Sequence, residues 1–335
     1  MADLTYAQLH EYIANALRAN RISEINAESV AHALSDAERD GQLGHGVSRV
    51  PSYCAQARSG KVNGNAQPNL QLTGATIRID ACHGFAYPAL DLAIPAMVDV
   101  ASEYGVAVCG IYNSHHSGVA GLIVERLAER GVVALMMANT PAAMVPQGGK
   151  TPVFGTNPIA FSCPRDGQNL PLVIDLSLSE VARGKVMLAA REGREIPLGW
   201  GLNSQSQPTT DPNAVLNGGS MIPIAGAKGS ALALMVELLA AALVGANPGF
   251  QATSFLSADG RPPGVGQWLL ALNPAFFSGT EFLTRVETIV NAVSEQPGAR
   301  LPGQSRIDAR SPGMIWVADS VLSEIRTLAT ASNGR

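Results

Sequence analysis

The sequence has few cysteines and few charged residues for a chain of 335 residues. The four cysteines are far apart and form no CxxC pair, which excludes a disulfide framework or a cysteine zinc site and is typical of reduced cytosolic thiols. Charged residues make up 15% and hydrophobic residues 46% of the chain, a balance that indicates a globular enzyme and excludes disorder. The cysteines are Cys54, Cys82, Cys109 and Cys163.

Strong net charge and long apolar runs are also missing. The formal net charge of −4 gives no general attraction to nucleic acid or to an anionic membrane, so we predict neither as a partner. Residues 1–12 lack the apolar region of a signal peptide. The most apolar stretch, residues 230–244, is too short to span a bilayer and is interrupted by Glu237, so it predicts a buried helix. We therefore expect a cytoplasmic protein.

Motifs of several common enzyme classes are absent. No GxGxxG follows a strand, so an ordinary Rossmann domain is not expected. Gly149-Lys150-Thr151 resembles the end of a P-loop, but the first glycine of that motif is replaced by Met144. Neither GxSxG nor HExxH occurs. His115 and His116 are adjacent at a predicted strand end and would point in opposite directions, so we predict no metal site.

The hydrophobic pattern predicts alternating helices and strands. Two amphipathic helices are expected in the first forty residues, one beginning after Thr5 as N-cap and one near Asn26. Pro51 suits the first turn of a third helix, which ends near Gly60. Further elements are predicted as a strand at 71–81, a helix at 87–104, a strand at 106–112, a helix at 118–130, a strand at 132–137, short strands and turns at 152–161, a strand at 172–176, a helix from 226, a strand at 268–272 and a helix at 280–294.

His45 and Arg49 are the candidate catalytic pair. His45 lies between glycines in a predicted loop, and Arg49 follows four residues later. Histidine has a pKa close to neutral, which suits proton transfer to a carbonyl oxygen or an imine nitrogen. The planar arginine side chain can hold a carboxylate through two hydrogen bonds. The spacing by itself is weak evidence, because most pairs with this spacing are a surface histidine and a solvated arginine.

Three turns and one aspartate could bind a cofactor or a substrate. Residues 113–118 connect a buried strand to a helix, so their backbone N–H groups could face a phosphate or an amide, or Ser117 could simply cap the helix. Residues 155–158 form a tight turn with side-chain donors, and residues 226–230 begin a helix beside Lys228. Asp175, at a strand end, could accept hydrogen bonds from ribose hydroxyls or cap a turn.

In this order the motifs resemble the type-2 malate/L-lactate dehydrogenase family, over about residues 6–322. The markers are residues 39–49, 114–116, 154–158, 175–176, 228–229 and 301–303. Within the family, residues 80–86, 189–194 and 228–241 are most similar to the Δ1-piperideine-2-carboxylate/Δ1-pyrroline-2-carboxylate reductases. The resemblance implies an α/β fold in which a non-Rossmann NAD(P)H-binding domain, residues 117–290, is inserted into a discontinuous substrate-binding and dimerisation domain, residues 1–116 and 291–335. It also implies a homodimer.

The resemblance assigns roles to individual residues. His45 is the expected proton donor, and Arg49 and Thr156 are expected to hold a small carboxylate substrate. Arg306 is the candidate ligand for the 2′-phosphate of NADPH, although NADH remains possible. The residues expected to line the cofactor site are His116, Ser117, Gly118, Val119, Ala120, Asp175, Leu176, Ser177, Gly226, Ala227, Lys228, Leu301, Pro302, Gly303, Gln304, Ser305, Arg306 and Ile307.

Three positions depart from the reductase pattern. Gly44 replaces a serine, Lys185 replaces an acidic residue and Ala227 replaces a histidine. The first two changes remove both expected partners of the catalytic histidine, so either water, Asp36 or Asp40 orients its ring, or the orientation of the ring matters less in this protein. Many hydroxyacid dehydrogenases of the family also carry lysine at the second position.

Two oxidoreductase hypotheses and one binding hypothesis follow. The first is hydride transfer from NADPH to C2 of a cyclic imino acid, giving L-proline or L-pipecolate; an iminium already carries its proton, so the weakened support of His45 matters less. The second is a 2-hydroxyacid dehydrogenase for malate, L-lactate or ureidoglycolate, which Lys185 favours. The third is a non-catalytic protein that binds a small molecule.

Overall fold

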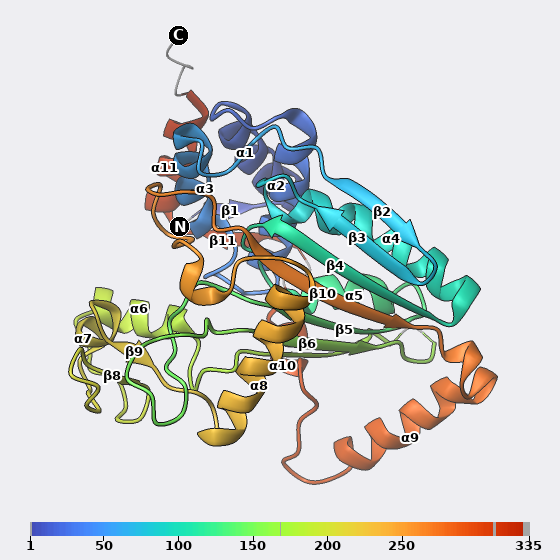
Figure 1. Ribbon diagram of the computed structural model, residues 1–335. Helices are drawn as coiled ribbons and strands as arrows, with labels where there is room; N and C mark the ends of the chain where they lie inside the picture. The colour runs from blue at the N-terminus through green and yellow to red at the C-terminus, as the bar shows by residue number, and fades with distance from the viewer. Residues whose placement is uncertain (1, 168, 311–312, 331–335) are drawn as a thin grey trace.

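The computed structural model describes residues 2–167, 169–310 and 313–330, with a seven-stranded sheet at its centre (Figure 1). All neighbouring strands are antiparallel except β3 and β4. This sheet differs from the parallel sheet of a Rossmann domain, as the missing glycine motif predicts. Its strands, in spatial order, are β2 (Asn69–Thr73), β3 (Thr76–Asp80), β4 (Val106–Ser114), β10 (Val265–Leu272), β5 (Val133–Ala138), β6 (Ile159–Cys163) and β7 (Leu172–Leu176).

Helices cover both faces of the sheet. Successive side chains of a strand point to opposite faces, and β10 illustrates this. Leu269 belongs to the core beneath α4 (Ala86–Tyr104) and α5 (Ala120–Ala128), whereas Trp268 packs with α8 (Ala227–Glu237) on the other face. The turns of α8 continue as a π-helix over Leu238–Leu243.

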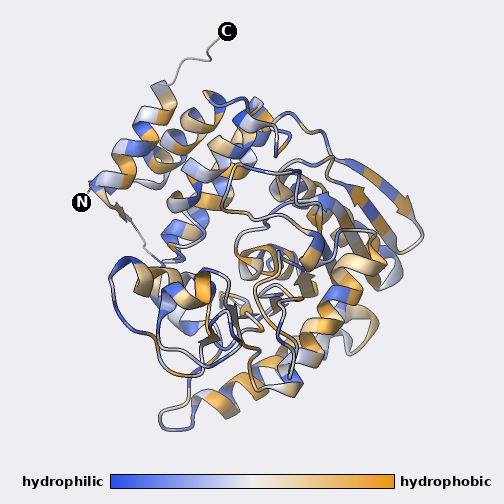
Figure 2. Ribbon diagram, turned by 60° about the vertical axis from the view of Figure 1, so that its left-hand side comes forward, coloured by the Kyte–Doolittle hydropathy of each residue, from blue (hydrophilic) through white to orange (hydrophobic). Residues whose placement is uncertain are grey.

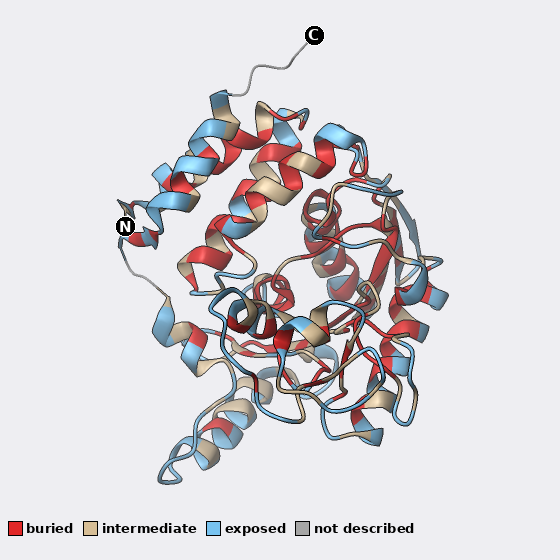
Figure 3. Cartoon of the chain, turned by 90° about the vertical axis from the view of Figure 1, so that its left-hand side faces the viewer, coloured by how far each residue is buried: buried red, intermediate tan, exposed pale blue. Residues whose placement is uncertain are grey.

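The two ends of the chain form one helical layer. Strand β1 (Ala2–Leu4) pairs with β11 (Ile315–Val317). Thr5 forms a capping box with Gln8 at the start of the first helix, as its residue type predicts. Figure 3 shows that the helices of this layer bury one side and expose the other. They are α1 (Tyr6–Arg18), α2 (Glu24–Arg39), α3 (Val50–Ser59) and α11 (Asp319–Thr330).

The remaining elements lie beside the sheet. One small unit has its own apolar core around Val186 and Val215. In Figure 1, α9 (Phe282–Ser294) projects from the body of the molecule, and Arg165 anchors it through an ion pair with Glu287 at 2.8 Å. The small unit contains α6 (Arg183–Arg191), β8 (Gly201–Leu202), α7 (Pro212–Leu216) and β9 (Ser220–Met221), and α10 (Gln304–Ala309) follows α9. Short 3-10 turns are Val47–Arg49, Gly249–Gln251, Pro274–Phe276 and Gly279–Glu281.

Two sequence predictions need correction. The predicted strand at 71–81 is a hairpin, because Thr73 pairs with Thr76 across a two-residue turn; Figure 2 shows hydrophobic and hydrophilic residues alternating along both of its strands. The stretch 230–244 is buried on one side only, since Leu238 is 55% and Leu243 is 64% exposed.

Within the described part of the chain, no helix combines the length and the apolar character needed to cross a membrane. The predicted domain division stays a prediction. The pairing of β1 with β11 brings the two ends of the discontinuous domain together. The predicted boundary at 116/117, however, falls between β4 and α5, which contribute side chains to the same hydrophobic core.

Candidate active site

The loop that carries His45 and Arg49 is tightly bonded. It begins at Gly41, whose φ of +71° ends α2 in a conformation that favours glycine. The backbone N–H of His45 donates to the carbonyl of Gln42 at 2.8 Å. Arg49 Nε donates to the carbonyl of Gly44 at 2.7 Å, which fixes the side chain. The loop therefore presents the candidate pair in one conformation.

His45 is half-buried and has no hydrogen bond on one ring nitrogen. Its Nδ1 is buried and unpartnered among the described residues. Its ring stacks on His116, with 5.1 Å between the centroids and 14° between the planes. Burial, and then the positive charge of Arg49, lower the pKa of His45 from 6.5 to about 4, so the imidazole is neutral before substrate binds.

The two aspartates predicted as partners of His45 bond elsewhere. Asp36 accepts from the hydroxyl of Tyr6 at 3.1 Å. Asp40 is fully buried and accepts from Arg306 at 2.6 Å and from Arg310 at 2.7 Å. The prediction that a neighbouring aspartate orients the ring is therefore wrong.

The carboxylate beside this loop is Glu38, which the sequence reasoning missed. Its Oε2 accepts from the backbone N–H of Val47 at 3.0 Å, and a side chain at Gly46 would overlap that oxygen. Burial raises the pKa of Glu38 to about 7. A signal was present, because Glu38 follows Leu34 by four residues on the apolar face of α2.

The two adjacent histidines bond to different residues of α3. His116 Nδ1 lies 2.7 Å from the hydroxyl of Tyr53, and His115 Nε2 lies 2.8 Å from Gln56 Oε1. No cluster of three or more potential ligands for a metal occurs in the described ranges. The rings therefore serve as packed, hydrogen-bonded groups.

The structure brings three of the predicted cofactor segments together around the start of α5. Gly118 has φ +69°, and a Cβ there would lie 2.8 Å from Tyr87 Oη, so the loop requires glycine. Asp175 Oδ2 accepts from the N–H of Gly121 at 2.7 Å. Gly303 lies so close to the carbonyl of Val173 that any side chain would overlap it. Residues 116–120, 175–177 and 301–307 thus share one region.

Ser117 does not cap α5. The N-cap position is Val119, which makes no side-chain hydrogen bond, and the carboxylate of Asp175 serves the helix N-terminus instead. Asp175 therefore accepts a hydrogen bond from the first turn of α5 through Oδ2. Oδ1 of Asp175 has no hydrogen bond among the described residues.

The turn that carries Thr156 is anchored by Glu237. Asn157 donates to Glu237 Oε1 at 2.9 Å, and Gly249 donates to Oε2 at 3.1 Å. The carbonyl of Thr156 accepts from the N–H of Leu178 at 2.9 Å, which places the turn beside the segment that follows Asp175. The charged residue that interrupts the apolar helix is therefore the anchor of this turn.

Arg306 is engaged inside the protein. Its guanidinium is 7% exposed and pairs with Asp40 at 2.6 Å and Glu125 at 2.8 Å. Although burial opposes ionisation, Arg310, Arg39 and Arg306 hold the pKa of Asp40 below its usual value. This pairing argues against Arg306 as the ligand of a 2′-phosphate, because the phosphate would have to displace two carboxylates.

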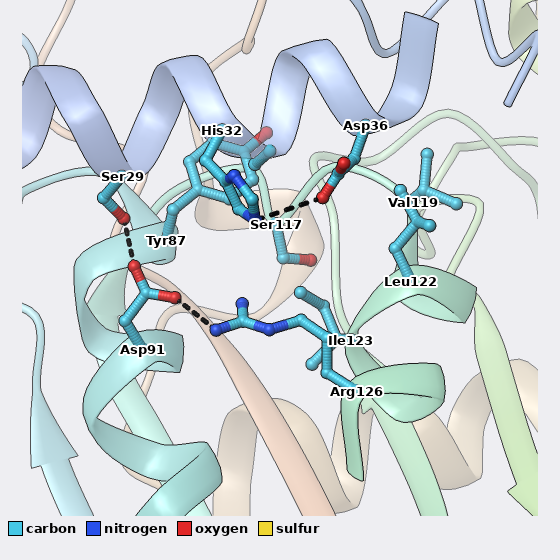
Figure 4. A pocket seen from close by; sticks show the side chains of 11 residues that line it. Ser29, His32, Asp36, Tyr87, Asp91, Ser117, Val119, Leu122, Ile123 and Arg126 are labelled. Carbon is cyan, nitrogen blue, oxygen red and sulfur yellow. Dashed lines mark hydrogen bonds and ion pairs between the residues drawn. The ribbon is translucent and has the colours of Figure 1, made fainter. Parts of the chain in front are cut away.

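Two hollows adjoin the predicted cofactor segments. Figure 4 shows the first, between α2, α4 and α5, where Asp91 joins Ser29 to Arg126 and Ser117 lies on the wall. Residues 300–305 line the second. Lys185 and Lys228 are exposed at the starts of α6 and α8.

Comparisons with known proteins agree with this fold. A family model described as malate/L-lactate dehydrogenase matches residues 4–325. A (2R)-3-sulfolactate dehydrogenase (NADP(+)) of Chromohalobacter salexigens is 50% identical over 94% of this chain and 95% of its own length. A Δ1-pyrroline-2-carboxylate/Δ1-piperideine-2-carboxylate reductase of Pseudomonas syringae pv. tomato is 40% identical over 97% and 96%.

Solved structures show the same similarity. The crystal structure of Δ1-piperideine-2-carboxylate reductase from Pseudomonas syringae pv. tomato matches with a TM-score of 0.92 and 39% identity over 98% of this chain and all of the other. Sulfolactate dehydrogenase from Methanocaldococcus jannaschii matches with a TM-score of 0.88 and 27% identity over 99% and 98%. The predicted family, its fold and the oxidoreductase class are confirmed, and the chain belongs to the malate/L-lactate dehydrogenase family.

Proposed function

We propose that the protein is an NADP-dependent dehydrogenase of a 2-hydroxy carboxylic acid with a second anionic group, such as 3-sulfolactate. The main support is the 50% identity to a (2R)-3-sulfolactate dehydrogenase across nearly the whole of both chains, compared with 40% to the imine reductase. Lys185 supports the same choice, because many hydroxyacid dehydrogenases of the family carry lysine at this position.

The candidate site suits oxidation of a secondary alcohol. A neutral His45 can accept the proton of the substrate hydroxyl. Arg49 uses Nε to hold its own loop, so its two terminal nitrogens remain to bind the substrate carboxylate, with Thr156 as a further ligand. NADP⁺, when bound along the three segments around α5, would accept the hydride from C2. A bound carboxylate also offsets the charge of Arg49, which lets His45 take its proton more easily.

Reduction of a cyclic imino acid is the second candidate. It is supported by the reductases at about 40% identity and by the TM-score of 0.92 to one of them. Protonation of the imine nitrogen precedes hydride transfer, so this reaction depends less on a well-oriented acid.

We further propose a homodimer. Leu234, Leu238 and Leu243 expose an uncharged apolar side of α8 and its π-helical extension, and such a surface is typical of contact with another chain. A second copy of this chain fits it, because the surface carries no charge that would repel itself. The cytoplasmic location stays a prediction.

Substrate profiling by NADPH absorbance tests the function. We expect kcat/KM for 3-sulfolactate oxidation to exceed that for malate and lactate, and sulfopyruvate reduction to exceed reduction of either cyclic imine. Faster turnover of a cyclic imine would make the second candidate correct. If purified protein turns over none of these substrates, or if His45→Ala retains full activity, the binding-protein hypothesis or another catalytic centre gains support.

A further inference from the structure

We propose that His116 is a positioning residue for His45, whose imidazole it holds by ring stacking while Tyr53 fixes the ring of His116. This inference rests on the proposed role of His45 in proton transfer. It explains how a histidine without the serine and the acidic residue of the reductase pattern keeps a defined orientation.

The first observation is that His45 lacks any hydrogen bond that would orient its ring. Its Nδ1 is buried without a partner among the described residues, and Gly44 and Lys185 replace the two expected partners. The nearly parallel ring of His116 is the contact that remains, at 5.1 Å and 14°. An imidazole that rotated about its Cβ–Cγ bond out of this plane would lose the face-to-face contact.

The second observation is that the ring of His116 is itself held rigidly. Its Nδ1 lies 2.7 Å from the hydroxyl of Tyr53, which in turn lies 3.2 Å from the hydroxyl of Tyr87. Tyr53 is fully buried. Phe255 packs against the ring of His116, with 5.3 Å between the two ring centroids. Residues from α3, α4 and the 253–257 segment therefore fix the ring from different directions.

The chemistry of the pair suits proton transfer. If Tyr53 donates to Nδ1, His116 is the neutral tautomer with its proton on Nε2. Burial, first, and the nearby charge of Arg49 hold the pKa of His116 well below its usual value, so it stays neutral. When His45 takes the substrate proton, its positive charge then faces an uncharged aromatic ring, which is a favourable arrangement.

Helix α3 carries both the tyrosine that fixes His116 and, at its N-cap, the arginine proposed to bind the substrate. Arg49 stands at the N-cap of α3, and Tyr53 follows four residues later, which places the two on the same side of the helix. A single rigid element therefore positions the substrate arginine and the hydroxyl that fixes His116.

Tyr53→Phe tests the proposal because it removes one hydroxyl and keeps the buried ring. We expect kcat for the preferred substrate to fall about tenfold, with KM and the NADPH dissociation constant within about twofold of wild type. The solvent deuterium isotope effect on kcat should rise, because proton transfer becomes slower. Tyr12→Phe is the matched control; its hydroxyl accepts from Arg326 at 3.0 Å between α1 and α11, and the variant should retain full activity.

His116→Phe and His116→Ala separate the effect of ring stacking from other roles of His116. They also test the proposal if Tyr53→Phe fails to fold. His116→Phe keeps an aromatic face, so we expect it to retain several times the kcat of His116→Ala. Equal kcat in the two variants, wild-type kcat in Tyr53→Phe, or a loss of NADPH affinity that parallels the loss of kcat would each overturn the proposal. Full activity in His45→Ala would instead overturn the proposed function on which it rests.

Discussion

The carboxylate of Glu38 accepts a hydrogen bond from the backbone N–H of Val47 at 3.0 Å, directly beneath the loop that carries His45. Glu38 is 6% exposed, and no cation pairs with it among the described residues. The loop thus depends on a buried carboxyl group whose ionisation is unfavourable, which links the stability of the protein to pH.

Glu38→Gln should stabilise the protein at alkaline pH. The folded protein keeps the Glu38 proton up to about pH 7, whereas the unfolded chain releases it near 4.5, so wild-type stability falls as the pH rises through this window. Glutamine does not titrate and keeps a carbonyl acceptor for Val47. We expect a gain of at most about 3 kcal/mol at pH 8 and little difference at pH 4, measured by urea denaturation. Glu38→Ala, which has no acceptor, should be less stable than Glu38→Gln at both pH values; an equal gain for Glu38→Gln at both would contradict the prediction.

Arg49→Gln should raise the pKa of His45. Burial, the larger cause, persists in the variant, but the positive charge that also lowers the pKa of His45 is removed. Histidine NMR titration should show His45 protonating at a higher pH than in wild type, still below 6.5. Arg285→Gln, an exposed change on α9, is the control and should leave the His45 titration unchanged. An identical titration in Arg49→Gln would show that the two groups do not interact.

Gly44→Ser and Gly46→Ala should differ sharply. An added Cβ at Gly44 meets nothing within 4 Å, so the serine of the reductase pattern fits without strain. Because stacking already orients His45 in our proposal, we expect kcat to change by less than about threefold. The alanine at position 46 would overlap Glu38 Oε2 and should lower the melting temperature and the activity. A large gain of activity in Gly44→Ser would mean that stacking alone orients His45 poorly.

Asp40→Asn should destabilise the protein strongly. The carboxylate pairs with Arg306 and Arg310, which join α10 to the end of α2, and removing it leaves buried positive charge. We expect a loss of about 3–5 kcal/mol in the free energy of unfolding. Glu24→Gln removes an exposed partner of Arg18 and should cost less than about 1 kcal/mol, so it is the control.

Arg306→Ala distinguishes the structural role of this arginine from the predicted cofactor role. We expect lower stability and an unchanged ratio of NADPH to NADH affinity, because Asp40 and Glu125 already hold the guanidinium. A selective loss of NADPH affinity would restore Arg306 as the 2′-phosphate ligand.

Local features of the fold could be predicted from the sequence because neighbouring residues determine them. Thr5 caps α1, and Pro51 lies in the first turn of α3. The hairpin at 69–80 was not predicted because its turn, Gly74-Ala75, lacks the Asn-Gly or Asp-Gly sequence that usually indicates one. The exposed side of α8 was missed because hydrophobicity does not tell which face of a helix another element covers.

The sequence by itself determined the family, the candidate pair His45 and Arg49 and the departures at Gly44, Lys185 and Ala227, because these are properties of residue order. Only the tertiary structure decided what surrounds that pair. Tyr53 meets His116 across 63 positions, and Arg306 meets Asp40 across 266 positions. Contacts over such separations depend on how helices and strands pack, which no local pattern encodes, so the orientation of His45 and the engagement of Arg306 emerged only from the folded chain.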